Sequence, residues 1–132
     1  MMKKLKIPSL PENLRMVENV IDEISSLHEF GSDMYGKILV ACVEAVNNSI
    51  VHGNKSNPEK NVDVIISSNE KELRIVVEDE GPGFDFENIP DPTAPENLEN
   101  IHGRGVFLMN HLSDEVKFSK NGAQVELVFN IE

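Results

Sequence analysis

Residues 44–53 carry the pattern that decides the fold of this chain, and they read Glu44-Ala45-Val46-Asn47-Asn48-Ser49-Ile50-Val51-His52-Gly53. The stretch is the second half of an expected helix that begins after Gly31, with Ser32 or Asp33 as its cap. The helix should end at His52-Gly53, because glycine commonly follows the last helical residue. At 100° per residue one broad arc is apolar and should face a core. The opposite side carries a polar stripe of Lys37, Glu44, Asn47, Asn48, His52 and Lys55.

The polar stripe has two explanations. A solvated face is the ordinary one, since helices normally keep their charges outside. Against it, asparagine is a poor helix former, and the pair Asn47-Asn48 costs about 1 kcal/mol relative to alanine. Glu44 and Asn48 also lie one turn apart on the same face, so their side-chain oxygens can converge on one point. Such oxygens suit Mg²⁺, and a carboxylate beside the metal can order or deprotonate an attacking hydroxyl.

The residues before this helix predict an edge strand and a first helix. Lys3–Ile7 is the expected strand, and Ser9-Leu10-Pro11-Glu12 is typical of a capping box with serine at the N-cap. A helix over Pro11–Leu27 should follow, because apolar residues repeat there at helical spacing: Leu14, Val17, Ile21 and Ile24, with His28.

After residue 60 the apolar period changes to two, which predicts strands. Alternating residues mark strands over 62–66, 73–79, 116–118 and 123–131, with hairpin turns at Asn69-Glu70-Lys71 and Asn121-Gly122. Gly105–Leu112 predicts a short third helix. The expected fold is α+β, a two-layer α/β sandwich in which helices cover one face of a mostly antiparallel, mixed sheet. At 132 residues, the chain should form one domain over residues 1–132.

The strand that ends at Asp79 places a carboxylate on the same side as core residues such as Val77. A buried charge is costly without a partner, so Asp79 should have a specific hydrogen-bond donor. The glycines of Glu80-Gly81-Pro82-Gly83-Phe84 allow the backbone to approach a ligand closely. An aspartate that merely accepts turn amides is the alternative explanation.

Residues 80–102 form a long polar stretch, which predicts a lid or binding loop. His102-Gly103-Arg104-Gly105-Val106 then opens the third helix. Glycines at a helix N-terminus leave free amides and a favourable dipole for phosphate. Each signal is weak alone, but together the polar helix stripe, the strand that ends in Asp79, the glycine turn, the lid-like loop and the glycine-rich helix start form an ordered set along the chain.

Composition excludes several other classes of function. The formal net charge is −11, which argues against direct nucleic-acid binding, where Lys and Arg contacts to phosphate dominate affinity. No apolar run approaches the roughly 20 residues that cross a bilayer, so no membrane association is expected. The single Cys42 cannot form an internal disulfide and lies in an apolar stretch, where a buried thiol is expected. Cytoplasmic localisation is the expectation.

Three motifs resemble those of the GHKL superfamily of ATP-binding domains (the Bergerat fold), and specifically its anti-sigma-factor serine kinase branch. Residues 44–53 resemble the branch's helix motif, Glu-Ala-x-x-Asn followed by His-Gly. Residues 79–84 resemble its Asp-x-Gly-x-Gly-Phe turn, and residues 103–109 resemble its second glycine motif. The resemblance covers roughly residues 8–132, with the motifs in order.

The resemblance implies a role for each matching position. Asn48 would ligate Mg²⁺, Glu44 would be the activating carboxylate, and Asp79 would accept a hydrogen bond from the adenine amino group. Gly83 would let the base approach the backbone. The implied nucleotide-binding set is Asn48, His52, Asp79, Gly81, Gly83, Gly103, Arg104 and Gly105.

The second glycine motif is spare, with one Gly-x-Gly pair. Gly103 and Gly105 would place amides against the phosphates as a lid closes. Arg104 could reach a phosphate or face solvent. Asn47 and His52 are expected neighbours whose parts stay open. Residues 85–100 offer no lysine to the phosphates.

The implied function is that of an ATP-dependent protein serine/threonine kinase and anti-sigma factor in a partner-switching system. Its cofactors would be ATP and Mg²⁺, and its partners a sigma factor and an anti-anti-sigma antagonist protein whose hydroxyl receives the γ-phosphoryl group. Two alternatives stay open: a nucleotide-gated module that sequesters a partner without phosphorylating it, and a detached histidine-kinase ATPase domain. The branch is often dimeric, so a homodimer is a further expectation.

Overall fold

The computed structural model describes residues 1–86 and 101–132. Its strands are β1 (Met2–Pro8), β2 (Asn61–Ser68), β3 (Glu72–Glu78), β4 (Glu115–Ser119) and β5 (Gln124–Asn130). They form one sheet in the order β1-β2-β3-β5-β4, and all of these neighbouring pairs are antiparallel. The α+β prediction is confirmed, although within the described residues the sheet is antiparallel throughout rather than mixed.

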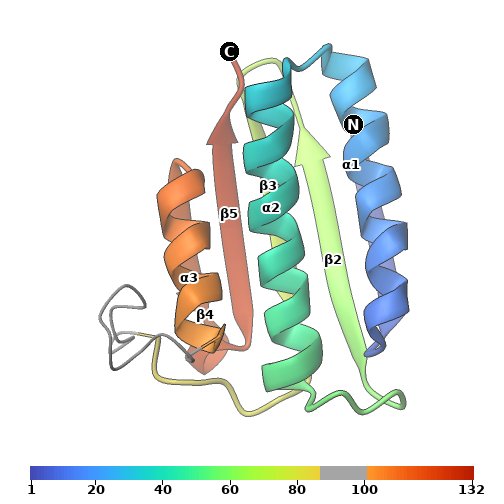
Figure 1. The fold of residues 1–132 in the computed structure, drawn as a ribbon, viewed down its shortest axis with the longest axis vertical. Coiled ribbons are helices and arrows are strands. Elements are labelled where there is room, and N and C mark those ends of the chain that lie inside the picture. The colour runs from blue at the N-terminus through green and yellow to red at the C-terminus, as the bar shows by residue number, and fades with distance from the viewer. Residues whose placement is uncertain (87–100) are drawn as a thin grey trace.

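The helices α1 (Leu14–His28), α2 (Ser32–Asn48) and α3 (Ile101–Leu112) form one layer on one face of the sheet. In Figure 1, α2 lies in the middle of this layer, with α1 on one side and α3 on the other. The core lies between the two layers, because inward residues of the strands alternate with outward ones. Val64, for example, is fully buried and pairs with both Leu5 and Val77. Cys42 is also fully buried, and burial raises the pKa of its thiol to about 12.

The predicted hairpins are both confirmed. β2 and β3 are joined through Asn69, whose side-chain oxygen accepts the backbone N–H of Lys71 at 2.8 Å. β4 and β5 are joined by the turn Lys120–Gly122, in which Asn121 and Gly122 both have positive φ, 58° and 97°. Asparagine and glycine tolerate this conformation, which is why the pair is a strong turn signal.

The predicted caps of the first two helices are wrong. Ser9 is fully buried and donates its hydroxyl to the Lys60 carbonyl at 2.7 Å, so it joins the end of β1 to a distant turn instead of capping a helix. A 3₁₀ turn over Pro11–Asn13 precedes α1. Gly31 is the N-cap residue of α2, and no side chain caps it.

The ends of α2 and α3 also differ from the prediction. α2 keeps α-helical geometry to Asn48 and then widens into a π-helical turn, η2 (Ser49–Gly53), a feature frequent at functional sites. Gly53 is not a left-handed residue after the helix, because the positive-φ glycines of the described residues are Gly83 and Gly122. α3 begins at Ile101, four residues before the predicted start.

The predicted lid falls mostly on residues 87–100, which lie outside the described residues. In the part of the chain that the structure describes, no helix combines the length and the apolar character that crossing a bilayer requires.

Candidate nucleotide site

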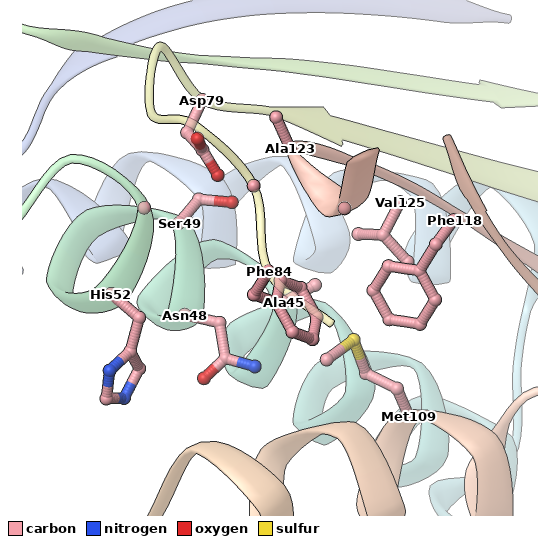
Figure 2. A pocket seen from close by; sticks show the side chains of 13 residues that line it. Ala45, Asn48, Ser49, His52, Asp79, Phe84, Met109, Phe118, Ala123 and Val125 are labelled. Carbon is pink, nitrogen blue, oxygen red and sulfur yellow. The ribbon is translucent and has the colours of Figure 1, made fainter. Parts of the chain in front are cut away.

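The end of α2, the end of β3 and the β4–β5 turn surround one hollow (Figure 2). It comprises about 400 Å³ of empty space, part of it open to solvent. Only about 30 Å³ of this space is open to the centre of a water-sized sphere. The hollow therefore has room for one or two water molecules but not for a purine. Nucleotide entry therefore requires lining side chains to move apart. Predicted site residues that line the hollow are Asn48, His52, Asp79 and Gly83.

Asp79 lies one residue beyond β3 and is held from several directions. Its backbone N–H donates to the Ala123 carbonyl at 3.0 Å. Its carboxylate accepts the Gly81 N–H at 2.8 Å and also accepts the Ser49 hydroxyl. Figure 2 shows the Asp79 and Ser49 side chains turned toward each other at the edge of the hollow. The predicted hydrogen-bond donors therefore exist, and they fix the direction in which the carboxylate can accept.

Burial raises the pKa of Asp79 above its ordinary value. The two hydrogen bonds from Gly81 and Ser49 oppose this shift, and the charge of Glu78 adds to it slightly. A partly buried carboxylate with a raised pKa, at the edge of a hollow, is the environment in which functional acids are commonly found.

Gly53 packs directly on the Asp79 carboxylate. A Cβ on Gly53 would lie 2.2 Å from Asp79 Oδ2, far closer than any side chain could approach. A Cβ on Gly81 would lie 2.1 Å from the Gly53 carbonyl oxygen. The absence of side chains at both positions is therefore what lets the α2 end and the Asp79 turn meet.

An apolar wall faces Asp79 across the hollow. Phe118, Val125 and Met109 gather there, from β4, β5 and α3 respectively (Figure 2). Phe84 also lines the hollow, and its ring meets that of Phe118 edge to face at a centroid distance of 5.4 Å. Apolar walls with one or two directed polar groups are the usual composition of a site for a flat, partly polar ligand such as a purine.

Glu44 and Asn48 reach the same point, as their spacing predicts. A Cβ on Gly105 of α3 would lie 3.0 Å from both Asn48 Nδ2 and Asn48 Oδ1, and 3.1 Å from Glu44 Oε2. These polar groups therefore meet directly beneath α3, and Figure 2 shows Asn48 turned toward that helix.

The Asn48 side chain carries a polar group that the described residues leave unsatisfied, which suits it to bind a ligand. Within the described residues its Nδ2 is buried and has no hydrogen-bond partner. A native buried amide without a partner is rare and commonly has a functional explanation. Asn48 Oδ1 and the Glu44 carboxylate fit Mg²⁺, which prefers oxygen ligands and usually takes few of them from the protein. The described residues contain no group of three or more His, Cys, Asp and Glu side chains that could hold a metal ion. A metal ion at this point would therefore take its other ligands from water and phosphate.

The remaining predicted residues are Gly83 and His52, which line the hollow, and the second glycine motif, which lies in α3. Gly83 has φ +87°, and its Cβ position is filled by the Asn121 carbonyl at 1.9 Å, so the β4–β5 turn is what requires glycine there. His52 lines the hollow, and burial, with the charge of Lys55, lowers its pKa.

The second glycine motif lies within α3. Gly103 is the third and Gly105 the fifth residue of the helix as described. The Gly105 amide therefore has a helical carbonyl four residues before it, that of Ile101. Arg104 is exposed and does not line the hollow.

Several residues of the site carried no recognisable signal. Ser49 has a small polar side chain whose place in the helix gives no sign that it bonds Asp79. Met109, Phe118 and Val125 are ordinary core residues by their spacing. Only knowledge of which strand ends meet could have placed them at the site.

The histidine kinase-like ATPase domain family matches residues 7–129. Serine-protein kinase RsbW of Oceanobacillus iheyensis is 26% identical over an alignment of 122 residues, which covers 88% of this chain and 77% of that protein. The RsbW kinases of Bacillus velezensis and Bacillus subtilis are 29% and 27% identical, over 89% and 86% of this chain and 78% and 75% of theirs. Because the family match covers nearly the whole chain and includes every group that surrounds the hollow, this chain belongs to the histidine kinase-like ATPase domain family.

Proposed function

We propose that this protein is an ATP-dependent protein serine/threonine kinase and anti-sigma factor of a partner-switching system. The single observation that carries the proposal is the convergence of Glu44 and Asn48 on one point, beside a hollow whose far end holds Asp79. Similarity to proteins named serine-protein kinase RsbW favours this reading over the other members of the family.

The proposed binding mode follows the hollow from one end to the other. Asp79 accepts a hydrogen bond from the adenine amino group, while Phe118 and Met109 provide apolar surface for the ring. Asn48 holds Mg²⁺ through its amide oxygen, and the metal supplies neutralisation of phosphate charge when it is bound. Backbone amides of the second glycine motif, including that of Gly103, face the phosphates.

Glu44 acts on the phosphoacceptor. A serine or threonine hydroxyl of the antagonist attacks the γ-phosphorus of ATP, and its proton passes to the Glu44 carboxylate. The bond between the γ-phosphorus and the β–γ bridging oxygen breaks, so ADP leaves and a phosphoester remains on the antagonist. Phosphoryl transfer depends mainly on positioning and on charge neutralisation, both of which this arrangement can provide. The new phosphate adds about two negative charges. Beside a protein with a net charge of −11, it would weaken the complex by repulsion.

The test mixes the protein with ATP labelled on its γ-phosphate, Mg²⁺ and the candidate antagonist, and follows label on both proteins. Glu44→Gln should lose transfer by about 100-fold or more while it still binds ATP, because removing a general base costs roughly 10²–10⁴-fold. Glu70→Gln removes the same charge at the exposed β2–β3 hairpin and should transfer at the normal rate.

The outcomes separate the alternatives. Acid-stable phosphate on the antagonist that disappears in Glu44→Gln supports the kinase. Partner binding that depends on ATP, with no label on either protein, supports the sequestering module. Acid-labile label on a histidine supports the histidine-kinase alternative.

A further inference from the structure

A closed hydrogen-bonded ring lies beneath the turn that carries Asp79. Asn54, only 1% exposed, is at its centre. Its Nδ2 donates to Ser9 Oγ at 2.9 Å and to the Asn61 carbonyl at 3.0 Å, and its Oδ1 accepts the Glu80 N–H at 2.8 Å. Asn61 returns a bond from its own N–H to the Glu80 carboxylate, which closes the ring.

Asn54 is tied to both sides of the nucleotide site. Its backbone N–H donates to the Ser49 carbonyl at 2.8 Å, which fixes it to the π-helical end of α2. The residue before it, Gly53, lies against the Asp79 carboxylate. The residue whose amide it accepts, Glu80, is bonded directly to Asp79 in the chain. The Asn54 side chain therefore joins the two backbone segments that set the position of this carboxylate.

The burial of Asn54 is not explained by turn formation alone. A turn asparagine commonly stays at the surface and bonds backbone two residues away. Asn54 instead makes side-chain bonds to residues 45, 7 and 26 positions away in the chain. Burying a primary amide is unfavourable unless its donors and acceptor are all satisfied, and here they are.

We infer that Asn54 is a positioning residue for base recognition. By accepting the Glu80 N–H, it holds the turn so that the Asp79 carboxylate points at the exocyclic amino group of adenine. This inference rests on the proposed nucleotide site. It adds to that proposal a residue that contacts no part of the ligand but determines how strongly the site prefers adenine to a base without the amino group.

The test measures a preference between bases rather than stability. ITP carries an oxygen where ATP carries the exocyclic amino group, so it offers the Asp79 carboxylate no donor at that position. Affinities for ATP and ITP, both with Mg²⁺, would be measured by calorimetry on the full chain. The wild-type protein should prefer ATP by about tenfold or more, as one hydrogen bond to a charged group predicts. In Asn54→Ala the preference should fall to less than about threefold.

A matched variant separates positioning from general damage to the fold. Ser9→Ala removes another buried member of the network and leaves the Asn54–Glu80 bond in place, so it should lower the unfolding temperature and keep the preference. Equal loss of preference in Asn54→Ala and Ser9→Ala overturns the inference.

A measurement on the wild-type protein covers the case in which Asn54→Ala does not fold. The Glu80 amide should exchange slowly with solvent and show scalar coupling across the hydrogen bond to the Asn54 side-chain carbonyl carbon. An amide that exchanges as fast as an exposed one overturns the inference. Failure of the proposed function looks different, since the wild-type protein would then bind neither nucleotide or show no preference between them.

Discussion

Replacing Gly53 with alanine tests the geometry of the Asp79 carboxylate most directly. The new Cβ would lie 2.2 Å from Asp79 Oδ2 and 2.3 Å from its Cγ. Ordinary van der Waals contact begins near 3.4 Å, so the carboxylate must withdraw by about 1 Å. Gly53 does not have a positive φ, so alanine adds no backbone strain, and the collision is the main effect of the change.

The size of the effect follows from the role proposed for Asp79. Moving the carboxylate by about 1 Å removes a hydrogen bond between a charged acceptor and adenine, which is worth roughly 1.5–3 kcal/mol. This corresponds to a loss of about 10- to 150-fold in ATP affinity. Overpacking at the same place should lower the free energy of unfolding by about 1–3 kcal/mol.

Calorimetric titration with Mg-ATP and thermal unfolding would measure the two effects on the same samples. Gly36→Ala is the matched control, because Gly36 lies within α2 and no atom comes within 4 Å of the Cβ that alanine would add. It should raise the free energy of unfolding by about 0.5–1 kcal/mol and leave ATP affinity unchanged. A folded Gly53→Ala protein that binds ATP within twofold of the wild type would show that Asp79 does not recognise the base.

Three further predictions concern Asp79 and Gly105. Because burial raises the pKa of Asp79, ATP affinity should fall as pH decreases through that raised pKa, at a higher pH than for an ordinary aspartate, and titrations from pH 7.5 to 4.5 would detect it. Because its pKa is raised on folding, ionised Asp79 lowers the free energy of unfolding above the folded pKa, and this cost disappears below the unfolded pKa of 3.8. Asp79→Asn should therefore raise the unfolding temperature at pH 7 and remove the contribution of Asp79 to the pH dependence of stability. The same variant should bind ATP weakly. Gly105→Ala should displace Asn48 and Glu44 by a few tenths of an ångström and slow phosphoryl transfer about tenfold or more, with a smaller change in ATP affinity. Equal losses of rate and affinity would contradict this division of the site.

Features that depend on neighbouring residues in the chain were predictable from the sequence. The period of two located the strands, and Asn121-Gly122 located the β4–β5 turn, because both signals are local. The meeting of Glu44 and Asn48 followed in the same way from the pitch of a helix. The need of Asp79 for donors followed from the cost of a buried charge.

Features that depend on distant partners were not predictable. Ser9 has the composition and spacing of an N-cap, and only its burial against Lys60 and Asn54 explains why it does not act as one. Gly53 likewise occupies the position of a helix-ending glycine, yet the Asp79 carboxylate is what excludes a side chain there. In both cases the local pattern was right about which residue matters and wrong about the reason.

The segment formed by α2 and the π-helical turn η2 can join the two proposed ends of the site. Gly53, in η2, packs on the Asp79 carboxylate at the proposed base end, and Glu44, nine residues earlier in α2, lies at the proposed reacting end. Asn48 lies between them, at the level where the phosphates would follow the ribose. The carboxylate proposed to recognise the base destabilises the fold when it is ionised, and the Asn48 amide has a donor that the described residues leave unpaired. Packing alone explains neither cost, whereas a ligand that contacts both groups explains both.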